Sequence, residues 1–369
     1  MRSFFSNSLS LALLFIWQSI MKGLECFLVG GAVRDRLLNR AAEDRDWVVV
    51  GSTPEQMISL GFHSVGKKFP VYLHPQTREE YALARKETKV GEGHLGFEVD
   101  ASATITLEED LIRRDITINA IAEDLDGKLI DPCDGLTDIK NKVIRHVSRA
   151  FTEDPLRVFR VARFIAELSE FKVADETKEL IVEICQGGAL RELSAERVSS
   201  EMLKALDSKN PQLFFKFLSE CGGLSDWFPE LIDRNFAFSS VDSIDRFCEL
   251  DLEKKSFESL VKRLKLSKKY EIASIHWSSF SRLIKNWRGS SKEELYDCLH
   301  STNFFHDPSN LNRILNLAGK HGSYEVEDLE NILNKLADMD FEYNRNELFG
   351  EALGRQIREF RIEWLRSQY

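Results

Sequence analysis

Two patterns of apolar and polar residues divide the chain. From Cys26 to about Val147, short β-branched runs such as CFLVGG and DWVVVG are interrupted by the helix-like stretch AVRDRLLN, which predicts mixed strands and helices. Beyond Asp154, apolar residues recur at i, i+3 and i+4 in LRVFRVARFIAEL, ETKELIVEIC, ERVSSEMLKAL and PQLFFKFLSE, and strand signals nearly vanish. The pattern therefore predicts an α+β protein, with an N-terminal α/β part followed by a helical part.

Glycines mark the turns and helix ends of this scheme. Asp126-Gly127, between AIAEDL and KLIDP, predicts a two-residue hairpin turn. Gly187-Gly188 and Gly222-Gly223 predict helix ends within the helical part.

The first residues follow a different pattern. Leu9 to Trp17 is almost wholly apolar, but nine residues are too few for a bilayer, which takes about 20 in a helix. No small-x-small cleavage site precedes Met21. We expect translation to start at Met21 and residues 1–20 to be a misassigned extension; a secretory signal or a membrane tether is the alternative.

Composition narrows the class of protein. The chain has 369 residues, 43% of them hydrophobic, which suits two or three domains of about 150 residues and excludes a disordered chain. Its formal charge of -10 excludes a protein that coats nucleic acid indiscriminately.

One segment, from Lys254 to Arg288, is nevertheless basic. It contains ten Lys and Arg and two Glu, interleaved with Tyr270, Trp277 and Trp287. This segment indicates either RNA-backbone contact or amphipathic helices with solvated lysines.

The six cysteines are scattered without a C-x-x-C pair. This spacing argues against a disulfide framework and against a thiolate zinc site. The simplest location for such a chain is the reducing cytoplasm.

The strongest chemical signal lies in the N-terminal part. Asp44 and Asp46 are two apart at the start of an apolar run, so in a strand their carboxylates lie side by side and suit Mg2+. Upstream, the helix after Gly30-Gly31 offers open backbone N-H groups to a triphosphate, with Arg34 one turn on. Glu80, on another predicted strand, is the candidate for a third acid.

Arginines in two further segments suit nucleotide binding. Arg114, in the Arg-Arg-Asp run of LIRRDITINA, is suited to phosphate, although a surface ion pair would give the same run. Asp154 and Arg157 are three apart at a helix start, where they present an acceptor beside a donor. That pair matches the pairing edges of cytosine and adenine, whereas a helix cap is the structural alternative for Asp154. Arg160 and Arg163 follow at three-residue intervals and could face the nucleotide, the RNA or solvent.

Together these segments resemble the bacterial class II tRNA nucleotidyltransferases, the CCA-adding enzymes of the polymerase-beta-like superfamily. The resemblance runs from Cys26 to about Leu206 through LVGGAVRD, EDRDWVVVG, VGKKFPVYLHPQTREEYALAR, RRDITINA, EDPLRVFRVARF and SAERVSSEMLKAL. It implies a polymerase-beta-like nucleotidyltransferase palm followed by a helical neck, body and tail. The implied activity is addition of the 3′-terminal CCA to tRNA from CTP and ATP, with release of pyrophosphate and without a template.

The resemblance also implies roles for the candidate residues. Asp44 and Asp46 would hold Mg2+ and act in catalysis; Glu80 is a candidate for a further catalytic acid from the strand pattern and not from the resemblance. The nucleotide-binding set would be Gly31, Arg34, Arg114, Asp154, Arg157, Arg160 and Arg163. The stretch between Arg85 and Asp110 matches the flexible loop that in this family helps to switch from C to A addition.

The expected domains follow from the same comparison. After residues 1–20, they are a nucleotidyltransferase head over 21–147, a neck with the base-reading motif over 148–207, and a tRNA-binding body and tail over 208–369. We expect a cytoplasmic protein without membrane attachment. A monomer is expected, with an oligomer left open.

One departure and two alternatives bear on the function. Many relatives continue into a histidine-aspartate phosphohydrolase domain; here the one His-Asp dipeptide, His306-Asp307, lacks partners at suitable spacing, so we expect that domain and its activity to be absent. Poly(A) polymerases share the palm but tend to end in a basic tail, whereas this chain ends in the mixed REFRIEWLRSQY. A poly(A) polymerase or an A-adding enzyme is the nearest alternative, and a non-catalytic RNA-binding protein is a more distant one.

Overall fold

The computed structural model describes residues 24–42, 44–66, 70–89, 97–320, 326–339 and 350–368. The expected extension over residues 1–20 lies outside them. The described chain divides into two compact units. Unit 1 runs to Leu193 and includes Cys221–Gly223, whereas unit 2 comprises Ser194–Glu220 and continues from Leu224. The head, neck and body boundaries at 147 and 207 remain a prediction.

Unit 1 is built on a seven-stranded mixed sheet in the order β3-β4-β5-β2-β1-β8-β9. Most neighbours are antiparallel, but β2 and β5 are parallel. The strands of this sheet are β1 (Glu25–Val29), β2 (Asp46–Val50), β3 (His63–Val65), β4 (Val71–Leu73), β5 (Glu80–Leu83), β8 (Ala122–Glu123) and β9 (Leu129–Ile130). Two small pairs accompany it, formed by β6 (Lys86–Lys89) with β7 (Phe97–Asp100) and by β10 (Val143–Ile144) with β11 (Lys172–Val173).

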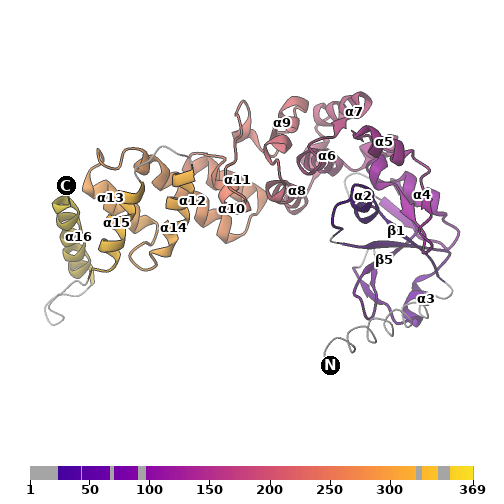
Figure 1. Ribbon diagram of the computed structural model, residues 1–369, viewed down its shortest axis with the longest axis horizontal. Coiled ribbons are helices and arrows are strands. Elements are labelled where there is room, and N and C mark those ends of the chain that lie inside the picture. Colours follow the sequence, from indigo (N-terminus) through magenta and orange to yellow (C-terminus); the bar gives the residue numbers. More distant parts are fainter. Residues whose placement is uncertain are drawn as a thin grey trace. The chain divides into compact units, whose positions relative to one another are not determined.

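Helices flank the sheet and then succeed it in unit 1 (Figure 1). They are α2 (Gly31–Leu37), α3 (Pro54–Ser59), α4 (Leu107–Ile112), α5 (Gly135–Asn141), α6 (Leu156–Glu167) and α7 (Asp175–Gln186). Short 3-10 turns are η1 (Thr117–Asn119), η2 (Arg149–Glu153) and η3 (Ala189–Glu192).

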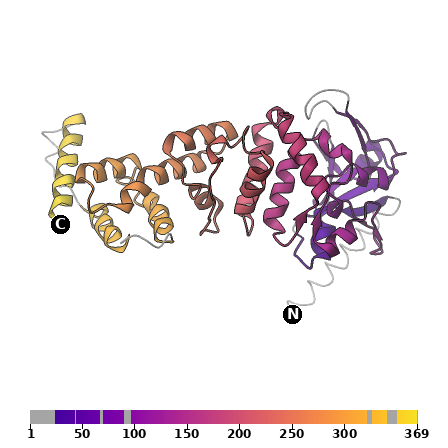
Figure 2. The ribbon, with the colours of Figure 1, turned by 90° about the horizontal axis from the view of Figure 1, so that it is seen from above.

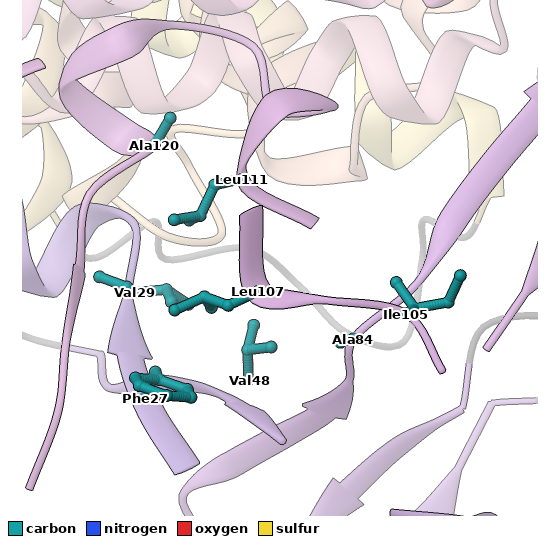
Figure 3. Close-up of a cluster of buried hydrophobic side chains, with 9 residues drawn as sticks. Phe27, Val29, Val48, Ala84, Ile105, Leu107, Leu111 and Ala120 are labelled. Carbon is teal, nitrogen blue, oxygen red and sulfur yellow. The ribbon is translucent and has the colours of Figure 1, made fainter. Parts of the chain in front are cut away.

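Strand β2 lies at the centre of the sheet and is buried on both faces. Trp47 and Val49 join one apolar cluster with Met57 of α3, whereas Val48 joins another with Leu107 and Leu111 of α4. Figure 3 shows this second cluster between α4 and strands β1 and β2. Side chains alternate between the faces of a strand, so the run DWVVV serves both clusters. Each fully buried side chain of this kind stabilises the fold by about 1.5–3 kcal/mol.

The predicted hairpin is present, but its turn is longer than two residues. Glu123 pairs with Leu129, and the Asp124 amide donates to the Lys128 carbonyl at 3.0 Å. The Asp124 carboxylate accepts from the amides of Asp126 and Lys128 at 3.0 and 2.8 Å. The Asp124 carboxylate thus accepts hydrogen bonds from two backbone amides of the turn, and this supports a loop longer than Asp126-Gly127.

Helices form the remainder of the chain, as the apolar periodicity predicts (Figure 2). They are α8 (Ala195–Asp207), α9 (Gln212–Cys221), α10 (Ser243–Cys248), α11 (Lys254–Leu264), α12 (Lys268–Lys285), α13 (Lys292–Ser301), α14 (Ser309–Lys320), α15 (Val326–Ala337) and α16 (Gly350–Ser367), with a 3-10 turn η4 (Pro229–Leu231). The α+β expectation is thus confirmed. None of the described helices combines the length and apolar character needed to cross a bilayer.

The basic segment of unit 2 presents lysines rather than aromatic rings. Tyr270, Trp277 and Trp287 are 4%, 5% and 3% exposed, so these rings pack in the core. Lys254, Lys255 and other basic side chains of α11 and α12 are exposed. Contact with nucleic acid through this segment would therefore use charge and not stacking.

Candidate active site

Asp44 and Asp46 line one pocket of unit 1. Asp46 is the first residue of β2, and Asp44 lies two residues before it. The pocket has a volume of about 550 Å³, and Glu79 and Glu80 also line it. It is completed by Ala42, Arg45, Thr77 and Arg78.

The parallel pairing of β2 and β5 places Glu80 beside Asp46, because these two residues are in register. Residues in register on neighbouring strands point to the same face of the sheet. Glu79 serves the other face, where it accepts from Trp47 Nε1 at 3.2 Å and pairs with Arg45 at 3.6 Å. Glu79 and Glu80 are adjacent in the chain, so their side chains lie on opposite faces of the sheet.

The charge of Asp46 depends on its neighbours. Partial burial raises the pKa of this carboxyl above its usual range, and the nearby Asp44 raises it further, whereas the Arg114 guanidinium lowers the pKa. Asp46 therefore lies within the electrostatic reach of both a second carboxylate and one arginine. A cation bound there would relieve the repulsion between the two acids.

The Gly30-Gly31 turn joins β1 to α2 next to these acids, since Val29 is in register with Asp46. Gly30 has φ +71°, and a Cβ there would lie 3.2 Å from Arg114 Nη1. A Cβ on Gly31 would lie 3.7 Å from Arg34 Nη2. Glycine thus supplies the backbone conformation and leaves room for two guanidinium groups at the turn.

Asp110, on the last turn of α4, holds the Arg-Arg pair. Its fully buried carboxylate accepts from Arg113 Nη2 at 2.7 Å and from Arg114 Nη2 at 3.1 Å. Burial alone would raise the pKa of Asp110, but Arg114 and Arg113 hold it below its ordinary value. The carboxylate stays ionised and fixes both arginines.

A second buried network connects α2 to α6. Arg34 Nη1 donates to Asn119 Oδ1 at 2.8 Å, and Asn119 Nδ2 donates to Asp115 at 3.3 Å. Asp115 in turn accepts from Arg160 Nε at 2.7 Å. Burial acts to raise the pKa of Asp115, yet Arg160 and Arg157 hold it well below its usual range. Two predicted nucleotide-binding arginines are therefore positioned by one chain of hydrogen bonds.

The ring of Phe164, in α6, makes cation–π contacts with three guanidinium groups. Its ring centroid lies 5.2 Å from Arg34, 5.6 Å from Arg160 and 4.1 Å from Arg163. Arg163 also pairs with Glu167 at 2.5 Å. Cation–π contacts of this kind hold planar guanidinium groups in place along α6.

Asp154 and Arg157 both contact backbone at the beginning of α6. Asp154 precedes Pro155, the N-cap residue, and its Oδ1 accepts from the Leu156 amide at 3.2 Å. Arg157 donates to the carbonyls of Ala150 and Arg113 at 2.9 and 2.6 Å. Both bonds of Arg157 go to backbone carbonyls, so they fix its guanidinium at the beginning of α6.

The donor set suits a hard divalent cation. Mg2+ in proteins is commonly held by one or two carboxylates and by substrate phosphates, and Asp44 and Asp46 supply two such groups. Within the described ranges, no three His, Cys, Asp or Glu side chains gather closely enough to hold a metal ion. His306 and Asp307 are therefore not part of such a group, and both side chains are exposed.

Sequence reasoning missed the residues that position the arginines. Asp110 carries a local signal, because it precedes Arg113 and Arg114 by three and four residues on one predicted helix. Asn119 and Phe164 each have partners within four residues, but their contacts with Arg34 join distant parts of the chain and carry no such signal. The surface ion pair considered for Arg113-Arg114-Asp115 is not what the structure has, because Asp115 is 7% exposed and pairs with Arg160.

Two family models match the chain. Residues 26–145 match the "Poly A polymerase head domain". Residues 170–234 match the "Probable RNA and SrmB- binding site of polymerase A". The first covers the sheet, the pocket and the Arg-Arg pair, and the second begins after α6.

Curated relatives are more than half identical over part of the chain. The "Multifunctional CCA protein" of Pseudoalteromonas atlantica is 56% identical over 210 residues, which are 56% of this chain and 52% of that protein. The protein of the same name from Mannheimia succiniciproducens is 57% identical over 210 residues, or 50% of its length. The chain thus matches about half the length of these relatives.

Solved structures share the fold over most of the chain. A Bacillus stearothermophilus CCA-adding enzyme in complex with CTP is 25% identical, with a TM-score of 0.63 over 88% of this chain and 80% of that one. A Thermotoga maritima CCA-adding enzyme complexed with tRNA is 19% identical, with a TM-score of 0.65 over 96% and 91%, and shows the fold alone. In its head-domain match, its curated relatives and its fold, the chain is thus similar to the CCA-adding enzymes.

Proposed function

We propose that this protein adds the 3′-terminal CCA to tRNA from CTP and ATP and releases pyrophosphate. The observation that carries the proposal is the convergence of Asp44, Asp46, Gly30-Gly31 and Arg114 in one unit, within a chain 56% identical over 210 residues to a protein named for CCA. The proposed acceptor and donors correspond to the tRNA and the nucleotides in the names of the solved relatives.

In the proposed reaction, the 3′-hydroxyl of tRNA loses its proton to solvent water as its oxygen attacks the α-phosphorus of the nucleotide. The bond between that phosphorus and the β-phosphate oxygen breaks, so pyrophosphate leaves. Asp44 and Asp46 would hold Mg2+, and Glu80 would add negative charge beside Asp46. A bound divalent cation supplies charge stabilisation at the attacking and leaving oxygens.

The arginines would bind the rest of the nucleotide. Arg114 and Arg34, at the glycine turn, would contact the triphosphate together with the Gly31 backbone. Asp154 and Arg157 would read the pairing edge of the base, and Arg160 and Arg163 would face the same pocket. Cytosine and adenine both offer an amino donor next to a ring-nitrogen acceptor, which complements one carboxylate and one guanidinium.

We place the protein in the cytoplasm and propose that basic side chains of unit 2 contact the tRNA. No disulfide joins the six cysteines in the described part of the chain, which supports a reducing cytoplasm. The exposed lysines of α11 suit the phosphate backbone of tRNA. A monomer meets these requirements, since one chain supplies every residue named.

Poly(A) synthesis is the second candidate, because the matching models are described for poly(A) polymerase. One assay distinguishes the two. Transcripts of tRNA that end before C74, C75 and A76 are incubated with labelled CTP or ATP and Mg2+. We expect C to be added to the first two and A to the third; long A tails on unrelated RNA would favour poly(A) polymerase, and extension of the third transcript alone would favour an A-adding enzyme.

A further inference from the structure

Asp110 is a buried carboxylate with partners on two sides. One oxygen accepts from Arg113 Nε and Nη2 at 3.1 and 2.7 Å, and the other accepts from Arg114 Nη2 at 3.1 Å. The side chain is 0% exposed, whereas those of Arg113 and Arg114 are 20% and 18% exposed. An interior carboxylate thus restrains two guanidinium groups that reach toward solvent.

Arg114 depends on this restraint for its place. Its Nη1 lies next to Gly30, its charge acts on Asp46, and its buried Nε has no hydrogen-bond partner in the described chain. Without the Asp110 bond, the guanidinium of Arg114 would still be attracted by the carboxylate of Asp46, on whose pKa it already acts. The guanidinium would then turn from the glycine turn toward the pair of acids.

The same carboxylate also holds the backbone where β6 begins. Arg85, the residue before β6, donates its amide hydrogen to Asp110 at 3.3 Å, and its carbonyl accepts from Arg113 Nε at 3.0 Å. Both polar groups of one peptide residue are therefore bound by the Asp110–Arg113 pair. A change in the Arg85 backbone must alter the carboxylate that fixes Arg114.

We propose that Asp110 is a positioning residue that fixes Arg114 for the nucleotide triphosphate and couples it to the backbone at Arg85. This inference rests on the proposed function, since it takes Arg114 as a nucleotide ligand. Asp110 itself does not contact the nucleotide. Its effect on nucleotide binding therefore passes through Arg114.

A double-mutant cycle on nucleotide binding tests this dependence. The dissociation constant of CTP with Mg2+, without tRNA, is measured for the wild type, Asp110→Asn, Arg114→Ala and the double variant. We expect Asp110→Asn to weaken binding about tenfold, the effect of one charge-assisted hydrogen bond. In the Arg114→Ala background, the same change should alter the dissociation constant by less than about twofold, because the residue through which it acts is gone.

Two further variants control the cycle. Glu108→Gln removes an exposed carboxylate from the same helix and should bind CTP as the wild type does. Asp110→Glu keeps the charge but moves it by one methylene, so it should keep the fold, as followed by thermal melting, and still bind CTP weakly. Tight binding by Asp110→Glu would show that charge and not position matters, and would overturn the proposal.

The outcomes separate this inference from the function on which it rests. Equal effects of Asp110→Asn with and without Arg114 would reduce Asp110 to a structural residue while the wild type still extends tRNA. A wild type that binds neither CTP nor ATP would instead refute the proposed function. Hydrogen exchange at the Arg85 amide should become faster in Asp110→Asn; unchanged exchange would refute the coupling to the backbone.

Discussion

The arginines around the candidate active site of unit 1 and the basic side chains of α11 and α12 in unit 2 differ in how they are held. In unit 1, the side chains of Arg34, Arg113, Arg114, Arg160 and Arg163 are between 8% and 34% exposed, and buried or half-buried acids and Phe164 fix them. In unit 2, Lys265, Lys268 and Arg282 are 65–72% exposed and form surface ion pairs. Preorganised cations suit one small ligand at a fixed place, whereas exposed cations suit a long polyanion.

We expect the largest loss of activity from replacing Asp44 or Asp46, the two aspartates of the candidate active site. Asp46→Ala should lower nucleotide incorporation by about a thousandfold or more, because it removes a proposed Mg2+ ligand, and charge stabilisation by such a cation is worth several kcal/mol. Asp44→Ala should do the same. Single-turnover extension of tRNA measures the loss, with thermal melting to confirm folding; near-normal turnover by either variant would remove that aspartate from the mechanism.

The buried network of unit 1 should matter next, through stability. Asp115→Asn leaves Arg160 without its counter-charge and should cost about 2 kcal/mol or more of unfolding free energy. The pKa of Asp115 is lowered in the fold, so its stabilisation is complete above the unfolded value of about 3.9 and is lost as the pH falls below it.

Urea unfolding at a series of pH values measures both effects. The wild type should lose stability faster than Asp115→Asn below about pH 4. Asp126→Asn, in an exposed turn where Asn-Gly is equally suitable, is the matched control. Parallel pH profiles for the wild type and Asp115→Asn would contradict the network.

Base selection should show a smaller effect. Asp154→Ala and Arg157→Ala should each reduce discrimination against UTP and GTP about tenfold, since one hydrogen bond to the correct base is lost. The ratio of kcat/KM values for the four nucleotides measures this discrimination. If both variants keep the wild-type ratios and only extend more slowly, Asp154 serves as a helix cap and Arg157 as a backbone contact.

We expect the smallest effect per residue from replacing exposed lysines of unit 2, and we expect it on the affinity for tRNA. Replacing Lys254, Lys255 or Lys262 with Gln should weaken tRNA binding modestly and reduce the slope of log affinity against log salt by about one for each lysine that no longer neutralises a phosphate. Lys140→Gln makes the same charge change on an exposed helix of unit 1 and should leave the slope unchanged. Equal slopes for all variants would place the tRNA-binding surface elsewhere.

The sequence predicts the parts of this molecule that depend on local pattern. Apolar periodicity predicts β2 and the helices from α6 onward, and the glycine pair predicts the turn before α2. The Asp115–Arg160 pair spans 45 residues and joins the Arg-Arg-Asp run to α6. Such a pairing is set by tertiary packing, so spacing along one chain does not reveal it. Asp110 is intermediate, because its two partners are helical neighbours but its bond to Arg85 spans 25 residues.

The central place of β2 has a consequence for how the pocket can adapt. The amides and carbonyls of β2 are bonded to β1 on one side and to β5 on the other, and Trp47, Val48 and Val49 are buried. Such a strand opens only when much of the sheet opens, so its amides should be among the slowest to exchange with deuterium. In the proposed reaction, accommodation of successive tRNA ends would then come from rotamer changes and from the surrounding helices, while the backbone beneath Asp46 stays still.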